Sequence, residues 1–173
     1  MRRPDHKLYS MRPSLSRPLV LALSLVVAGT ASGQKRDDNE IIMVSAQDRE
    51  MVAAIQKARS SLDTFLELAR NPPPEVSGLK LKVMVKDSNG TEHFWVAPFK
   101  PTATGFEGTL ANEPRIVKSV KHGQLLSFTR AEISDWGYVK NGRQVGSFTV
   151  CVMLKQAPKE QADYYRKNHG FDC

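Results

Sequence analysis

Four ionisable residues in this sequence have side chains suited to acid–base chemistry. Glu92, Glu113 and Asp135 are carboxylates with polar or aromatic neighbours, and His93 supplies an imidazole, the side chain most often used as a general acid or base. Two paired carboxylates can run a hydrolysis as general acid and base. Carboxylates are common and no spacing singles out a pair, so a hydrolase that uses these residues is the alternative hypothesis. Convergence of the four groups in one concave pocket would support it, and scatter would count against it.

Other catalytic and cofactor signatures are absent from the sequence. Beyond the N-terminal region the histidines are His93, His122 and His169, and neither C-x-x-C nor H-x-x-x-H occurs. Metal sites need clustered ligands, and nucleophilic catalysis needs a serine or cysteine beside a base. The sequence has no nucleophile elbow and no glycine-rich phosphate loop. We therefore expect no metal site and no cofactor, and the sequence leans against an enzyme.

The stretch EHFWVAPF (92–99) concentrates aromatic residues in eight positions. We expect Trp95 and Phe99 in the core, because burying such rings removes a large apolar area from water. His93 would lie beside them, half-buried and hydrogen-bonded, and a ligand or catalytic role for it stays open. The alternative is a ligand platform on one exposed face, made by Trp95, Trp136 and Tyr138.

A hairpin is predicted around the turn DSNG. Apolar residues alternate with lysines over 79–86, which is the pattern of a half-buried strand. A two-residue Asn-Gly loop would place Lys86 opposite His93. A three-residue loop would pair Asp87 with Thr91 and set the apolar positions of both strands opposite each other. The second register separates apolar from charged residues better, so we predict it.

An amphipathic helix is predicted before the hairpin. Ser45 begins S-A-Q-D, the spacing of a capping box, and Asn71 precedes three prolines that end the helix. The gaps between apolar residues alternate between three and four, so one stripe faces a sheet along about six turns. Its members are Met51, Ile55, Ala58, Leu62, Phe65 and Ala69.

The rest of the chain is predicted to form strands and a short helix. Asn-Gly at 141–142 marks a second hairpin, and Gly170 ends the final helix. The predicted class is α+β: an N-terminal amphipathic helix packed on a curved, mainly antiparallel sheet of five to six strands, with a short C-terminal helix. The further strands are expected in 105–112, 112–123, 125–130, 133–139 and 144–154, and the helix in 158–168.

The chain has two cysteines, Cys151 in a predicted strand and Cys173 at the last position. In an oxidising compartment an even cysteine count favours a disulfide. A Cys151–Cys173 bond would hold the C-terminal helix against the sheet and contribute about 3 kcal/mol. Two free thiols are the alternative.

The N-terminal region resembles a secretory signal peptide. An apolar run at 19–28 follows basic residues and precedes small residues, and it is too short to span a bilayer. We expect a signal peptide over 1–33, with Met1 or Met11 as the start, then a flexible lead over 34–44 and one globular domain over 45–173. Residues 1–33 hold five basic residues and one acidic residue, so the mature chain has 20 basic and 17 acidic residues, a net charge of +3. This mild charge does not indicate nucleic-acid binding.

Several motifs together resemble the YegJ-like family of conserved bacterial domains of unknown function. The motifs run in order over 48–154: DREM, EHFW, G-x-LANEP, KHGQ, ISDW-x-YV and NG-x-x-x-G-x-FTV. The resemblance implies small bacterial proteins, some exported, without an established activity, and it does not cover the tail that holds Cys173. It makes these motif residues candidates for the functional site: Glu92, His93, Trp95, Asn112, Glu113, Pro114, Asp135, Trp136 and Tyr138.

The leading hypothesis is therefore an exported, non-enzymatic binding or interaction module of the cell envelope. It would act in the periplasm or outside the cell on a protein or small-molecule partner, and its mature chain would have no transmembrane span. The envelope hydrolase described above is the alternative.

Overall fold

The computed structural model describes residues 48–173. The predicted signal peptide (1–33) and the lead (34–44) lie outside the described residues, so they stay predictions. Ser45 also lies outside them, but the capping box predicted from it is wrong, because Asp48 is the N-cap of α1 and not its third residue. None of the described helices is long and apolar enough to cross a bilayer.

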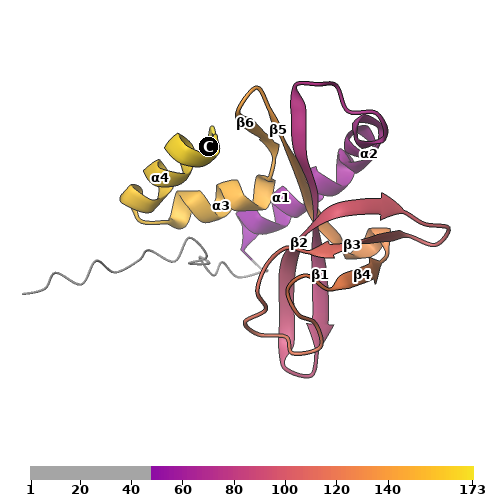
Figure 1. The fold of residues 1–173 in the computed structure, drawn as a ribbon. Helices are drawn as coiled ribbons and strands as arrows, with labels where there is room; N and C mark the ends of the chain where they lie inside the picture. Colours follow the sequence, from indigo (N-terminus) through magenta and orange to yellow (C-terminus); the bar gives the residue numbers. More distant parts are fainter. Residues whose placement is uncertain (1–47) are drawn as a thin grey trace, which may run out of the picture. The chain divides into compact units, whose positions relative to one another are not determined.

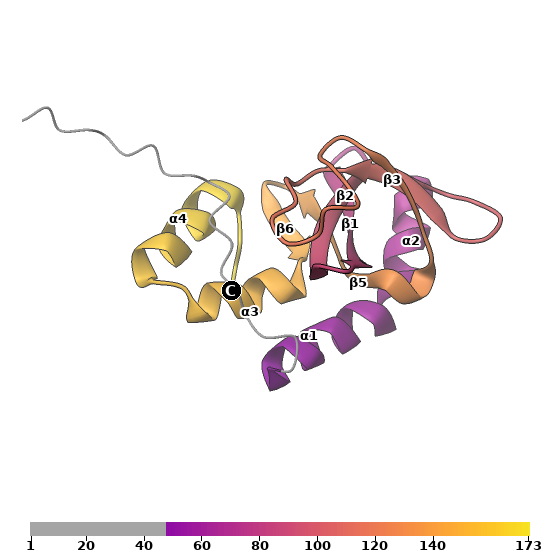
Figure 2. The same cartoon turned by 90° about the horizontal axis from the view of Figure 1, so that it is seen from below.

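The described domain combines four α-helices with a six-stranded antiparallel sheet (Figures 1 and 2). The order of the strands across the sheet is β4-β3-β2-β1-β5-β6. This confirms the predicted α+β class and the antiparallel sheet. The helices are α1 (Arg49–Ser60), α2 (Leu62–Arg70), α3 (Phe148–Gln156) and α4 (Lys159–His169), with a 3-10 turn at Arg130–Glu132. The strands are β1 (Val76–Asp87), β2 (Gly90–Pro101), β3 (Phe106–Leu110), β4 (Leu125–Phe128), β5 (Ile133–Lys140) and β6 (Arg143–Gly146).

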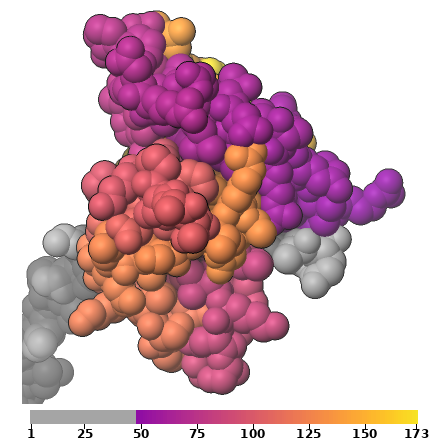
Figure 3. Space-filling view, turned by 90° about the vertical axis from the view of Figure 1, so that its right-hand side faces the viewer, coloured from indigo at the N-terminus to yellow at the C-terminus, as the bar shows by residue number. Residues whose placement is uncertain are grey.

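The amphipathic segment forms two consecutive helices where one was predicted. Asp48 caps α1, because its carboxylate accepts a hydrogen bond from the Met51 amide at 3.0 Å. The break falls at Ser61, whose hydroxyl donates to the carbonyl oxygen of Lys57 at 2.7 Å. Serine bonds of this kind compete with the helix ladder and bend helices. The apolar stripe nevertheless continues through the break, and Figure 3 shows α1 and α2 as one purple band above the strands.

The core lies between α1, α2 and one face of the sheet. Phe65 of α2 stacks on Trp136 of β5, with ring centroids 5.0 Å apart. The Trp136 indole N–H donates to the Ala58 carbonyl oxygen at 2.9 Å, so the buried ring has a polar partner. Each large side chain fully buried here stabilises the fold by about 1.5–3 kcal/mol. The strands contribute Leu81, Val83, Phe94, Val96, Leu110 and Ile133 to the same core.

The predicted register of the first hairpin is wrong, and so is the alternative with an Asn-Gly loop. Asp87 pairs with Gly90 around a two-residue Ser-Asn turn, so Lys82 faces Trp95 and Val83 faces Phe94. A local hydrogen bond explains the observed register. The Asp87 carboxylate accepts a hydrogen bond from the Asn89 amide at 2.7 Å, which closes the turn one residue earlier than predicted.

The corrected register moves Trp95 out of the core. Phe94 is buried there instead, and the half-buried Trp95 lies on the opposite face of the sheet. The prediction holds for Phe99, which packs against the core with its ring centroid 5.9 Å from that of Phe65. A register shift between Val96 and Phe99 returns the strand to the core side.

The predicted strand over 144–154 is also wrong after its first residues. β6 ends at Gly146, and Phe148 begins α3, so Cys151 lies on a helix. Gly146 and Ser147 both have positive φ, 76° and 52°, which no strand accommodates. A Cβ at Gly146 would overlap the Trp136 ring, so the turn needs glycine.

Other predictions can be compared directly. The strands over 105–112, 125–130 and 133–139 and the helix ended by Gly170 are confirmed. The segment 112–123 holds no strand and instead loops beside the hairpin.

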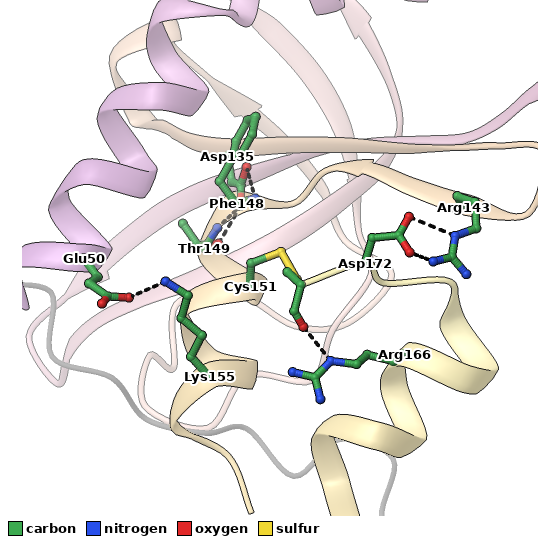
Figure 4. Close-up of a disulfide and its surroundings, with 10 residues drawn as sticks. Glu50, Asp135, Arg143, Phe148, Thr149, Cys151, Lys155, Arg166 and Asp172 are labelled. Atoms are coloured by element: carbon green, nitrogen blue, oxygen red, sulfur yellow. Dashed lines mark hydrogen bonds and ion pairs between the residues drawn. A yellow bond between two sulfur atoms is a disulfide. The ribbon is translucent and has the colours of Figure 1, made fainter. Parts of the chain in front are cut away.

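The predicted pair Cys151–Cys173 is joined as a disulfide (Figure 4). It attaches the end of the chain to α3, where Leu154, Ala162 and Phe171 form a small separate core. The tail also contacts the β5–β6 turn, because the Gln144 amide donates to the Gly170 carbonyl oxygen at 2.9 Å.

Candidate functional site

The carboxylate of Glu92 anchors the connection between β3 and β4. It accepts hydrogen bonds from the backbone amides of Arg115, Ile116 and Val117 at 2.9–3.3 Å. Asp87 holds the same loop through the Lys118 amide at 2.6 Å. These bonds use the lone pairs that an acid or base would need.

Three further motif residues also lie away from a common site. The Asn112 side-chain oxygen accepts from the Trp95 amide at 2.8 Å and so extends the ladder between β2 and β3. Glu113 is exposed and lies 3.8 Å from the His122 imidazole. Pro114 is half-buried in the same loop.

The three aromatic candidates do not form a shared platform. Trp136 and Tyr138 pack on the core side, where their ring centroids lie 5.0 and 6.3 Å from that of Phe65. Trp95 lies on the other face, because it pairs with Lys82 while Leu81 pairs with Trp136. The platform hypothesis is wrong in this form.

A different group of side chains converges on the face opposite the core. Lys80 and Lys82 project from β1 toward Trp95 of β2, with their ammonium nitrogens 4.8 and 5.4 Å from its ring centroid. We call these three residues the lysine–tryptophan cluster. Contacts of this geometry are cation–π interactions, each worth about 0.5–2 kcal/mol. The register that was not predicted is what builds the cluster.

Asp135 closes one side of the cluster and caps α3. It faces Lys82 across the β1–β5 pair and is fully buried. One oxygen accepts from the Trp136 and Phe148 amides at 2.8 and 3.2 Å. The other accepts from the Thr149 amide at 2.8 Å and from its hydroxyl at 2.6 Å (Figure 4). Its negative charge therefore lies at the helix N-terminus, where the helix dipole stabilises an anion.

Thr149 links this cap to the lysines. Its hydroxyl oxygen accepts a hydrogen bond from the Lys82 ammonium at 3.0 Å while its hydroxyl hydrogen is donated to Asp135. Lys80 donates to the Gln144 side-chain oxygen at 3.3 Å. Each ammonium has three N–H donors, so each keeps donors that these bonds do not use.

Burial shifts the pKa values of the charged groups in the cluster. It lowers the pKa of Lys80 and of Lys82, and the neighbouring Lys80 charge lowers the pKa of Lys82 further, while Asp135 partly offsets both. Burial raises the pKa of Asp135, and the hydrogen bonds from Thr149 and the Lys82 charge oppose that rise. The lysines and the aspartate thus stabilise each other's charged forms without direct contact.

His93 lies two residues before Trp95 on the same face. Its Nδ1 is 2.8 Å from the Ser134 hydroxyl, which donates to the Lys82 carbonyl oxygen at 3.2 Å. The hydroxyl has one hydrogen, so the imidazole Nδ1–H donates to it. Burial lowers the pKa of His93 to about 4, and the positive charges of Lys82 and Arg59 add to this effect. His93 is therefore neutral at physiological pH, as a hydrogen-bonded, half-buried residue.

The fold and the cluster define an α+β domain with a six-stranded antiparallel sheet and a positively charged aromatic surface. The chain belongs to the bacterial family described as "Uncharacterized protein conserved in bacteria (DUF2314)", which matches residues 48–173. This match includes the tail that the motif resemblance left out, so that limit was wrong.

Two relatives agree with this assignment. The chain is 30% identical to "Uncharacterized protein YegJ" of Escherichia coli (strain K12), over 87% of this chain and 96% of the relative. It is 28% identical to "Putative ankyrin repeat protein NMB1133/NMB1171" of Neisseria meningitidis serogroup B (strain ATCC BAA-335 / MC58), over 78% of this chain. The match spans 56% of that protein's length. No solved structure matches the chain.

Sequence reasoning found Trp95, His93 and Asp135 but missed both lysines and Thr149. Lysines at alternate strand positions are typical of a solvated face, so they carried no signal. A signal was available in the alternation: a pairing that buries Phe94 places Trp95 on the face of β1 that carries Lys80 and Lys82, and in the observed register it lies opposite Lys82.

Proposed function

We propose that this chain is an exported binding module and that its ligand surface is the lysine–tryptophan cluster. The apolar run and small residues before position 34 support export through a cleaved signal peptide. The absence of catalytic signatures from the sequence favours binding over catalysis. Location in the cell envelope and the non-enzymatic role are parts of this proposal.

The observation that carries the binding role is the environment of Trp95. Its indole is half-buried beside two ammonium groups, on the sheet face that α1 and α2 do not cover. Aromatic rings with few rotatable bonds are effective ligand contacts, because little conformational entropy is lost when they are covered. The remaining ammonium donors lie next to that ring and can fix a polar group.

The hydrolase alternative has weaker support from the geometry. Glu92 and Asp135 use their oxygens on backbone amides, and Glu113 lies in the exposed loop beside His122. His93 donates to Ser134 and faces no carboxylate among its described hydrogen-bond partners. Within residues 48–173 no hydrogen bond or ion pair joins any two of the four predicted side chains.

Export is tested by expressing the full chain in a bacterium and fractionating the cells. Mass spectrometry of the intact protein should find a product that begins at Gln34 in the periplasm or medium. Recovery of the chain only in the cytoplasm, with its N-terminal 33 residues still attached, would contradict export.

Binding is tested with the protein recovered from that expression. It is incubated with a small-molecule extract of the envelope and washed, and the retained compounds are identified by mass spectrometry. Wild type and the control Leu125→Ala, which changes an exposed side chain on β4, should retain the same compounds. Trp95→Leu should lose them while staying folded, with a thermal midpoint lowered only by the loss of the two cation–π contacts. Equal retention by all three proteins would refute this surface.

A further inference from the structure

Lys80 and Lys82 lack an ion-pair partner. Within residues 48–173 neither ammonium forms a salt bridge with a carboxylate, and their hydrogen-bond acceptors are an amide oxygen and a hydroxyl. Lysines that leave water without an ionic partner are rare, because the desolvation of an unpaired charge is unfavourable. Here two such charges lie at alternate positions of one strand and repel each other.

The groups around the lysines leave a net positive charge. Among the carboxylates of residues 48–173, Asp135 is the one that acts on them, and its oxygens are occupied by Trp136, Phe148 and Thr149. His93 is neutral at physiological pH. Two ammonium charges therefore face one carboxylate that is already bonded elsewhere.

Ser147 adds an unsatisfied polar group at the base of the cluster. Its hydroxyl is fully buried and has no hydrogen-bond partner among the described residues. A Cβ added at Gly137 would contact both this hydroxyl and the Lys80 side chain, so the two lie over the same point of β5. A buried hydroxyl without a partner is unfavourable by about 1–3 kcal/mol.

We propose that the lysine–tryptophan cluster binds the phosphate or carboxylate group of a small molecule, with the ligand's planar or apolar part on Trp95. This inference rests on the proposed function and names the chemical class of its ligand. The anion would accept hydrogen bonds from the unused N–H donors of both ammonium groups. Such charge-assisted hydrogen bonds are stronger than those between neutral groups. The anion would also be the ion-pair partner that the two lysines lack.

The test uses probes that differ in charge and in ring content. Phenyl phosphate, benzoate, inorganic phosphate and neutral benzyl alcohol are titrated into the ¹⁵N-labelled protein. The Trp95 indole N–H signal reports binding, and the Trp136 signal is the internal control because that ring is buried in the core. We expect phenyl phosphate or benzoate to bind with a dissociation constant at least tenfold lower than that of benzyl alcohol, as measured from the Trp95 signal. Inorganic phosphate should bind more weakly than phenyl phosphate, because it lacks the ring.

Matched variants separate a built site from general positive charge. Lys80→Met and Lys82→Met keep an unbranched side chain, one atom shorter, and remove the charge, and each should weaken binding of the aromatic anion at least tenfold. Lys121→Met removes an exposed charge from the 112–123 loop and should leave the affinity unchanged. Lys82→Met also removes a neighbour of Asp135, so its thermal midpoint is measured, and Lys80→Met decides the result if Lys82→Met is unfolded.

The outcomes distinguish this inference from the proposed function. If benzyl alcohol binds as tightly as the anions, the anionic class is wrong while Trp95 remains a binding surface. If Lys121→Met weakens binding as much as Lys80→Met, the anion responds to overall charge and the inference is overturned. If no probe shifts the Trp95 signal, the inference also fails, and the extract experiment alone decides the proposed function.

Discussion

Replacing Asp135 by asparagine tests the central structural claim, which is that a carboxylate from β5 caps α3. The substitution keeps the size of the side chain but removes its charge, and it places an NH₂ group against one set of backbone donors. Four N–H or O–H groups, from Trp136, Phe148 and Thr149, would lose a charged acceptor. The Lys82 ammonium would lose its nearest negative charge.

The magnitude follows from opposing effects. Hydrogen bonds to charged groups contribute about 1.5–3 kcal/mol each, and the favourable position at the helix N-terminus adds about 0.3–2 kcal/mol. Burial raises the pKa of Asp135, so the charged form is disfavoured by desolvation and part of this gain is offset. Breaking one partner of a buried charged network is unfavourable by about 3–5 kcal/mol, and we expect a loss of about 3 kcal/mol.

Urea denaturation at pH 7 measures this loss as a lower midpoint with an unchanged slope. The control is Asp63→Asn, because Asp63 is an aspartate that pairs with a cation, Arg130 at 2.8 Å, but is exposed. Exposed pairs contribute little, so the control should change the free energy of unfolding by less than about 0.5 kcal/mol. A double-mutant cycle with Thr149→Val should give a coupling of at least about 1 kcal/mol. An Asp135→Asn protein as stable as the control would refute the capping role.

Three further predictions concern the disulfide and two titrating side chains. Cys173→Ser should lower the free energy of unfolding by about 3 kcal/mol, since the bond closes a loop with sequence separation 22; dithiothreitol should lower the wild-type midpoint equally and leave the variant unchanged. Backbone hydrogen bonds, chiefly from Lys118, lower the pKa of Asp87 to about 2, so its stabilisation is present above about pH 4 and is lost as pH falls through about 2. The midpoint difference between wild type and Asp87→Asn should therefore be present at pH 5 and vanish near pH 2, and a difference that persists would contradict the cause. The pKa of His93 is about 4 in the folded protein and about 6.5 unfolded, so stability should fall as pH decreases from 6.5 to 4, by about 1–2 kcal/mol after allowing for solvent contact. His93→Gln should remove this part of the pH profile, whereas His122→Gln, at an exposed position, should keep it.

Local patterns predicted the elements whose boundaries are set by local chemistry. The apolar stripe from Met51 to Phe65, the Asn-Gly turn at 141–142 and the glycine after α4 each act within a few residues of the structure they define. The predicted disulfide also followed from residue type and number alone. These features do not depend on which residues meet across the sheet.

The failures share a dependence on distant partners. The segment FTVCVML is rich in β-branched residues and reads as a strand, yet it forms α3 because Asp135, fourteen residues earlier, satisfies the first amides of the helix. The hairpin register was ambiguous because Phe94 and Val96 form one apolar alternation and Trp95 belongs to another. Packing of Phe94 and Val96 against the helices, together with the early turn closed by the hydrogen bond from Asn89 to Asp87, selects the register on which the lysine–tryptophan cluster depends.

The motif residues divide by what their side chains contact. Glu92 and Asn112 bond to backbone amides, Trp136 fills the core and Asp135 caps a helix, so each has a structural role that accounts for its chemistry. Trp95 differs, because its backbone groups bond to the 111–112 segment while its indole lies against two lysines outside the core. A leucine there would pair in the sheet equally well and would leave the ammonium groups without the ring. The choice of tryptophan at this position is thus better explained by what the indole contacts on the open face than by folding, and that is why Trp95→Leu should abolish binding while the protein still folds.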